Sequence, residues 1–173
     1  QYVGRAKEIQ KAEKERMNGG HPCQAVPVLK DVMGEVKKQY PEADRKNTGF
    51  GSTIFAVKPG DGSAREQAAS CQKVLGGWAN IANEYATKRY RSNLINWGML
   101  PFLIQPGDLP FKNLDYLFVP GIKKAVEDKT EEIKAYVVTP GEGMKEFSLK
   151  LGELTDEERQ IILKGCLINY NRV

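Results

Sequence analysis

The segment TIFAVKPGDGSAREQAASCQKVLGG, residues 53–77, sets the class of the fold. It opens with a β-prone apolar run at 53–57 and breaks at the glycine- and proline-containing turn 58–62. A helical pattern follows from Ser63 to Leu75, and a pair of glycines ends it. Residues 78–85 are apolar enough for a second buried strand, and another helical pattern comes next. This order of strand, turn, helix, strand and helix is typical of an α/β domain.

The flanking segments add helices and a hairpin. Residues 5–18 alternate in charge and predict an exposed helix, whereas a helix ending before Pro41 carries an apolar face made of Leu29, Val32, Met33, Val36 and Tyr40. Two β-prone runs at 133–138 and 145–151 are joined by a Pro-Gly turn, which predicts a hairpin. Thr155 and Glu158 form a capping box for a last helix, on whose packing face we place both Ile161 and Ile168.

Composition limits the classes of protein to which this chain can belong. Its 173 residues suit one globular domain, so we treat 1–173 as a single domain. No apolar run approaches the ~20 residues that a membrane helix needs, so we expect no membrane partner. Three scattered cysteines indicate a reducing compartment, and we expect the cytoplasm. The net charge of +4 is too small to indicate nucleic acid. Because the sequence begins with Gln1, we expect a domain excised from a longer chain.

Ser63 opens the helix in the deciding segment. Glu66 follows three residues later, which predicts a capping box with the Ser63 hydroxyl at the helix N-terminus. Free N–H groups and the helix dipole favour an anion there, and Arg65 adds a fixed cation suited to a carboxylate. Gly60 and Gly62 allow a ligand to approach the backbone closely. The same surroundings would stabilise a serine alkoxide, which could act as a base. The simpler alternative is that Ser63 only caps the helix.

Two motifs carry a resemblance to a known family. The string Gly-Asp-Gly-Ser-Ala-Arg-Glu-Gln-Ala-Ala at 60–69 resembles the Gly-x-Gly-Ser-Ser-Arg-Glu-x-Ala motif of the aconitase family. The string Arg-Ser-Asn-Leu-Ile-Asn-Trp-Gly-Met-Leu-Pro at 91–101 resembles that family's Arg-x-Asn-Leu-x-x-x-Gly-x-Leu-Pro motif, in the expected order and at the expected separation. The resemblance covers 49–173, whereas 1–48 is a helical part outside it.

The resemblance implies a fold and a reaction. The fold is α/β, a swivelling β/β/α domain with a mixed sheet flanked by helices. It closes over domains, in the same chain or in a large subunit, that carry a [4Fe–4S] cluster. The complete enzyme is then a hydro-lyase that isomerises or hydrates a hydroxy polycarboxylic acid, so an anionic di- or tricarboxylate is the expected substrate. This chain supplies no cluster ligands by this interpretation and is inactive alone.

The resemblance also implies roles for single residues. Ser63 is the expected catalytic base, and Arg65, Gly62 and Ala64 are expected to bind substrate. Ala64 stands where the family has a second serine, which removes one donor near the substrate. The family has a further substrate-binding arginine upstream, for which Arg5 is a candidate; the alternative is a solvated helix charge. No metal ligands are assigned.

Two other functions stay open at this point. Some relatives of aconitase bind RNA, which would make this chain a regulatory module; dispersed lysines paired with acids argue against it. A domain that has lost its chemistry and keeps only a structural role is the second alternative, and Ala64 suggests it.

Overall fold

The computed structural model describes residues 2–172, and the chain divides into two compact units. Unit 1 comprises residues 1–52, 108–120 and 134–147, and unit 2 comprises 53–107, 121–133 and 148–173. Six strands are hydrogen-bonded in the order β1-β2-β3-β6-β5-β4, and β5 and β6 contribute residues to both units. β2 and β3 are parallel, whereas β3 with β6 and β4 with β5 are antiparallel. The predicted fold class, α/β with a mixed sheet flanked by helices, is confirmed.

The elements have the following bounds. Unit 1 holds α1 (Tyr2–Met17), α2 (Pro22–Ala25), α3 (Val28–Gln39), β4 (Tyr116–Phe118) and most of β5 (Glu132–Thr139) and β6 (Gly143–Lys150). Unit 2 holds β1 (Ser52–Ala56), α4 (Arg65–Val74), β2 (Gly77–Ala82), α5 (Lys88–Asn96), β3 (Leu100–Leu103), α6 (Ile122–Glu127), α7 (Asp156–Leu163) and α8 (Leu167–Asn171). No helix between residues 2 and 172 is both long and apolar enough to cross a membrane.

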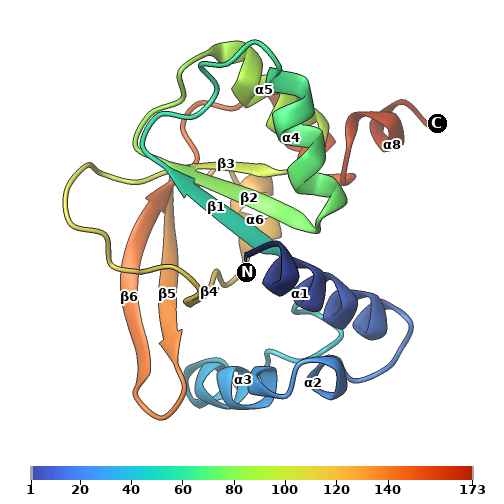
Figure 1. Ribbon diagram of the computed structural model, residues 1–173, viewed down its shortest axis with the longest axis vertical. Coiled ribbons are helices and arrows are strands. Elements are labelled where there is room, and N and C mark those ends of the chain that lie inside the picture. Colours follow the sequence, from blue (N-terminus) through green and yellow to red (C-terminus); the bar gives the residue numbers. More distant parts are fainter. Residues whose placement is uncertain (1, 173) are drawn as a thin grey trace. The chain divides into compact units, whose positions relative to one another are not determined.

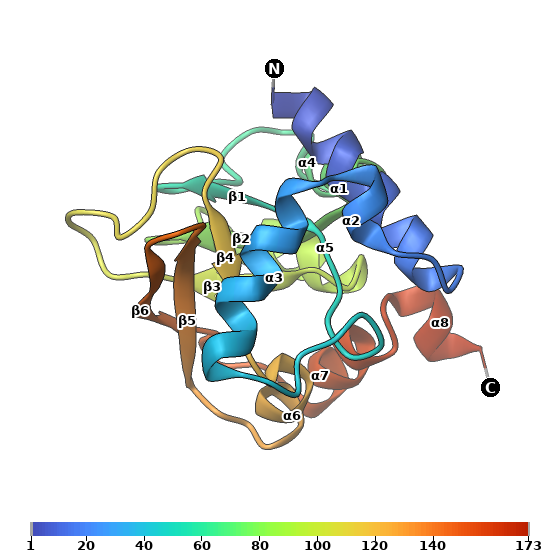
Figure 2. The same ribbon diagram turned by 90° about the horizontal axis from the view of Figure 1, so that it is seen from below.

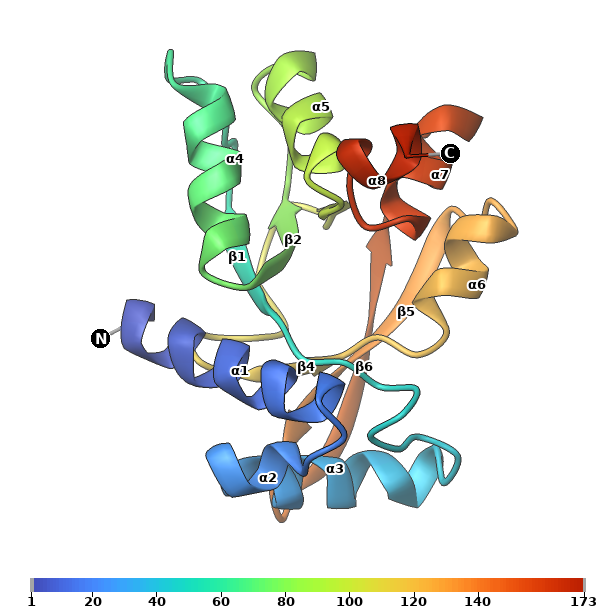
Figure 3. The same ribbon diagram turned by 90° about the vertical axis from the view of Figure 1, so that its right-hand side faces the viewer.

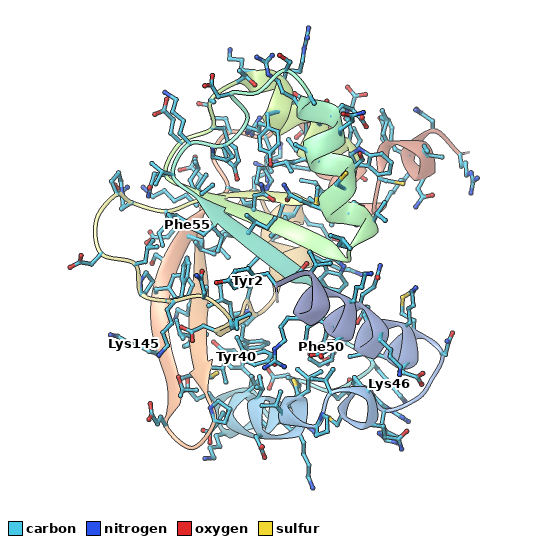
Figure 4. All side chains as sticks on the ribbon, in the orientation of Figure 1. Tyr2, Tyr40, Lys46, Phe50, Phe55 and Lys145 are labelled. Atoms are coloured by element: carbon cyan, nitrogen blue, oxygen red, sulfur yellow. The ribbon has the colours of Figure 1, made fainter. Side chains whose placement is uncertain are left out.

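Unit 1 is built on the apolar face of α3. Val32 and Val36 pack against Val138 of β5, and Tyr116 and Phe118 of β4 cover them; Figure 2 shows α3 beside β4 and β5. A second cluster joins the three helices and includes Ala12, Leu29 and Phe50. In Figure 4, Phe50 lies beneath α1, and Tyr40 lies at the end of α3, where its hydroxyl is 2.8 Å from that of Tyr136. The predicted α3 face is therefore the core of this unit.

The charged helix α1 is less exposed than its sequence predicts. Ala12 is fully buried, and Glu13 is buried beside it. The Glu13 carboxylate accepts two bonds from Arg16, at 2.5 and 2.8 Å, and one from the backbone N–H of Phe50 at 2.9 Å. A buried carboxylate needs such partners, because an unpaired charge is costly to desolvate. Ala12 and the hydrogen-bonded Glu13 therefore give α1 a packing face, although the helix has few apolar residues.

Glu35 links α3 to the β5–β6 turn and makes unit 1 sensitive to acid. Its buried carboxylate accepts from Lys38 Nζ at 3.0 and 3.1 Å and from Gly141 N at 3.3 Å. The hydrogen bond with Lys38 is the main cause that lowers the pKa of Glu35, and the bond from Gly141 lowers it further. Its contribution to stability is present above the pKa of an unfolded glutamate, about 4.3, and is lost as the pH falls through the lowered native pKa.

We expect Glu35→Gln to be less stable than the parent at pH 7 and to lose that difference as the pH falls below about 4. Chemical denaturation at several pH values measures this, and Glu42→Gln, at a nearby exposed carboxylate, is the control. A difference between Glu35→Gln and the parent that stays constant down to acid pH would contradict the role given to Glu35.

Unit 2 places α4 and α5 against the parallel strands. Figures 1 and 3 show the two helices side by side next to the strands; α4 contacts β2, and α5 contacts β3. Their shared core is Ala69, Tyr90, Leu94 and Met99, with Tyr85 and Trp97 at its edge. Because parallel strands need a crossover helix, the order β2-α5-β3 follows from the chain's α/β pattern.

The C-terminal segment confirms one prediction and corrects another. Thr155 and Glu158 form the predicted capping box, with Oγ1 of Thr155 3.1 Å from Glu158 N and Oε2 of Glu158 2.8 Å from Thr155 N. The packing face predicted through Ile168 is wrong. α7 ends at Leu163, Gly165 takes a left-handed φ of +90°, and Ile168 lies on the separate helix α8 with 62% of its surface exposed. Gly165 turns the chain there because glycine adopts this conformation without strain.

Candidate functional site

Ser63 lies in the exposed loop between β1 and α4. α4 begins at Arg65 with Ala64 as its N-cap, and no side chain caps it. The predicted capping box is therefore wrong, because Ser63 precedes the position from which a hydroxyl can reach the third helical N–H. Glu66 does not reach back to the cap either: its Oε1 accepts from Trp97 Nε1 at 2.9 Å. Among residues 2–172, the Ser63 side chain makes no hydrogen bond, so its hydroxyl is not committed to the helix.

The stem of the Ser63 loop is fixed along the segment that leads into α5. Glu84 N donates to Val57 O at 3.1 Å, and Ala86 N donates to Pro59 O at 2.9 Å. The Lys58 ammonium pairs with the Glu84 carboxylate at 2.8 Å. These contacts repeat at alternate residues on both segments, as in a short strand pairing. The loop is therefore anchored as far as Gly60, three residues before Ser63.

Gly60 is required at the point where the loop turns. Its φ is +99°, and an added Cβ would lie 2.5 Å from Cβ of the buried Tyr90. A side chain would thus be strained and would collide with the first turn of α5. Gly62 differs, because an added Cβ there would meet no atom within 4 Å. The space beside Ser63 on this side is open.

Arg65 closes the loop around Ser63. Its Nε donates to the Gly60 carbonyl oxygen at 3.1 Å, which ties the residue after the N-cap to the residue at the turn. The side chain is half-buried, and within the described part of the chain it forms no ion pair. The two Nη groups of the guanidinium keep their donors for an anion. The first helical bond of α4 runs from Ala68 N to Ala64 O at 2.9 Å, so the preceding N–H groups have no helical acceptor.

A buried polar network lies under the loop, and no local sequence pattern indicates it. The Tyr90 hydroxyl accepts from Asn80 Nδ2 at 2.8 Å and from Gln72 Nε2 at 3.0 Å, which joins α5, β2 and α4. The Tyr85 hydroxyl donates to Phe102 O at 2.9 Å and to Asn80 O at 3.3 Å. Burial is the main cause that raises the pKa of Tyr85, so its phenol stays protonated and shares its one proton between the two carbonyls, with the shorter bond to Phe102 O. Such a network fixes side-chain positions because each bond specifies a direction.

Arg5, the other candidate for substrate binding, lies in unit 1, whereas Ser63, Gly62, Ala64 and Arg65 lie in unit 2. It is on α1, more than half exposed, and its Nη1 is 3.1 Å from Oε2 of Glu8. An exposed pair of this kind contributes little to stability and holds the side chain weakly.

The described residues do not fit an iron–sulfur cluster. Cys23 lies in unit 1, whereas Cys71 is exposed on α4 and Cys166 is the N-cap of α8. Between residues 2 and 172, no group of three His, Cys, Asp or Glu side chains is placed to hold a metal ion. Cluster sites need three or four grouped thiolates, which residues 2–172 do not bring together.

Comparison with known proteins gives a consistent family. Residues 25–107 match the model of the aconitase C-terminal domain. The chain is 28% identical over 132 residues to aconitate hydratase A of Rickettsia bellii, an alignment that covers 73% of this chain and 15% of that protein. It is also similar to the structure of 3-isopropylmalate dehydratase (leuD) from Methanocaldococcus jannaschii, at 24% identity and a TM-score of 0.42, over 84% of this chain and 81% of that one. The resemblance seen in the sequence is confirmed: residues 25–107 match the aconitase C-terminal domain family, and the chain is similar to an aconitate hydratase.

Proposed function

We propose that this chain is the C-terminal domain of a hydro-lyase of the aconitase type and that Ser63 is its catalytic base. The observation that carries the proposal is the Ser63 loop itself. An exposed serine with an uncommitted hydroxyl sits in a loop anchored at Gly60, between that anchor and the first turn of α4. A cap or a packing residue would have its hydroxyl bonded or buried. A base needs it free and fixed in place.

The proposed step is proton removal next to a carboxylate. The Ser63 oxygen, as an alkoxide, takes the proton from a carbon adjacent to a substrate carboxylate, so a C–H bond breaks and an O–H bond forms. The electron pair left on carbon becomes the double bond as the hydroxyl on the neighbouring carbon departs as hydroxide. The proton now on Ser63 passes to that hydroxide, which releases one water and restores the alkoxide. The free N–H groups of the first turn of α4 and the guanidinium of Arg65 lower the cost of the alkoxide.

Arg65 defines the substrate class. Its Nε is occupied by Gly60, but its Nη groups can bind a carboxylate in a bidentate manner. A substrate with two or three carboxylates fits a site that has this cation and a helix N-terminus a few residues from the base. We therefore propose a hydroxy di- or tricarboxylic acid. Gly62 and Ala64 flank Ser63 without bulky side chains, and we place the substrate against them.

The cluster and the rest of the site belong to a partner in this proposal. The chain spans about 15% of the length of the curated relative that it matches, and its described cysteines are scattered. A [4Fe–4S] cluster on other domains, in the same chain or in a separate large subunit, would supply a Lewis acid for the departing hydroxyl.

The proposal is tested by assaying the assembled enzyme on a panel of hydroxy acids and following the double bond by its ultraviolet absorbance. We expect reversible dehydration of at least one hydroxy di- or tricarboxylate and none of hydroxy monocarboxylates, because a single carboxylate cannot bind both Arg65 and a second site. Absence of dehydration with every di- and tricarboxylate would refute the proposed reaction.

A further inference from the structure

We propose that Thr87 is a positioning residue for Ser63 and acts through the carbonyl oxygen of Gly60. This inference rests on the proposed role of Ser63 as base. Thr87 lies outside both motifs that connect the chain with its family, and its side chain is half-buried at the start of α5. Its Oγ1 is 3.3 Å from Gly60 O and 3.1 Å from Tyr90 N.

In these two contacts the Thr87 hydroxyl acts once as an acceptor and once as a donor. As an acceptor, it caps α5 by receiving the N–H of Tyr90. As a donor, it gives its one proton to Gly60 O, which also accepts from Arg65 Nε. The donors approach from α5 and from α4, so one carbonyl oxygen couples the loop to both helices.

This coupling restrains the backbone both before and after Ser63. Gly60 and Arg65 bracket Ser63, and the Nε bond between them closes a short ring of backbone around it. Without a further contact, the segment from Gly60 to Arg65 could still move as one unit relative to α5. Thr87 attaches it to α5, whose first turn is held in the core by Tyr90 and its bonds to Asn80 and Gln72. A base displaced by about 1 Å can lose on the order of 100-fold in rate, so this attachment matters for turnover.

Thr155 provides a matched control. It is also an N-cap threonine whose hydroxyl accepts from the N–H three residues later, but it caps α7 and makes no bond to the Ser63 loop among the described residues. Thr87→Val and Thr155→Val therefore both remove a helix cap, and only the first removes a bond to Gly60. Thr87→Ser keeps the hydroxyl and tests for rescue.

Two readouts on the assembled enzyme test the proposal. With Thr87→Val, we expect amide hydrogen exchange at residues 60–64 to be faster by about tenfold or more, and kcat to fall about 10- to 100-fold with KM within about twofold. Thr87→Ser should restore kcat to within about threefold of the parent, and Thr155→Val should leave kcat and the exchange at 60–64 unchanged.

Unchanged exchange at 60–64 in Thr87→Val, or an equal fall of kcat in Thr87→Val and Thr155→Val, would overturn the positioning role. Failure of the proposed function gives a different result. If Ser63→Ala turns over like the parent, Ser63 is not the base, yet the exchange measurement still decides whether Thr87 holds the loop.

Discussion

Replacing Ser63 by alanine is expected to lower kcat of the assembled enzyme by about 10²- to 10⁴-fold, the usual contribution of a general base. The same change should leave the free energy of unfolding within about 0.5 kcal/mol of the parent value, because Ser63 is exposed and caps no helix. A large loss of activity without a loss of stability separates a chemical role from a structural one. Steady-state kinetics and chemical denaturation of the same preparation measure both.

Ser70 supplies the control for this experiment. It lies on α4, seven residues further along the chain, and its hydroxyl donates to Gln67 O at 3.2 Å. Ser70→Ala removes a serine hydroxyl from α4, the helix that follows the Ser63 loop, without changing the loop itself, so kcat should not change. A Ser63→Ala enzyme as active as Ser70→Ala would show that another group removes the proton.

Replacing Gly98 by alanine is expected to produce the largest loss of stability in unit 2. Gly98 follows α5 with a φ of +73°, and an added Cβ would lie 1.8 Å from the carbonyl oxygen of Gly165. The left-handed conformation costs alanine about 1–2 kcal/mol, and overpacking against backbone costs about 1–3 kcal/mol more. We expect the free energy of unfolding to fall by about 3 kcal/mol or more, measured by denaturant titration.

Two other glycines separate the cost of the left-handed conformation from the cost of overpacking. Gly165 has a φ of +90°, but its added Cβ would meet nothing closer than 3.7 Å, so Gly165→Ala should cost only the conformational part. Gly34 lies inside α3 with open space around it, so Gly34→Ala should stabilise the chain by about 0.5–1 kcal/mol. If Gly98→Ala is no more harmful than Gly165→Ala, the contact between α5 and the α7–α8 turn is not as close as described.

Local patterns predicted the elements well where periodicity and end signals agreed. The helix expected after the strand predicted at 78–85 forms as α5, and the hairpin of β5 and β6 forms around its Pro-Gly turn. Thr155 caps α7 because its hydroxyl stands directly before an apolar helical pattern. The short helix α6 was missed, since six residues hold too few turns for a periodic signal.

The candidate site shows where sequence reasoning stops. The Ser-x-x-Glu spacing of Ser63 and Glu66 predicted a cap, but α4 starts later because Arg65 bonds to Gly60 and Glu66 bonds to Trp97. Both partners are fixed by tertiary contacts that no local pattern encodes. Thr87 was overlooked for the same reason, because only the folded chain brings its hydroxyl to Gly60.

The central claim is that this chain works as one domain of a cluster-bearing hydro-lyase. The most direct measurement is the size and iron content of the native protein that contains this chain, captured from its source with an antibody against it and assayed for dehydration of hydroxy acids. We predict a polypeptide or complex much larger than 19.3 kDa, with about four irons per copy, that dehydrates a di- or tricarboxylate. A chain recovered alone, without iron and without activity, would contradict the claim.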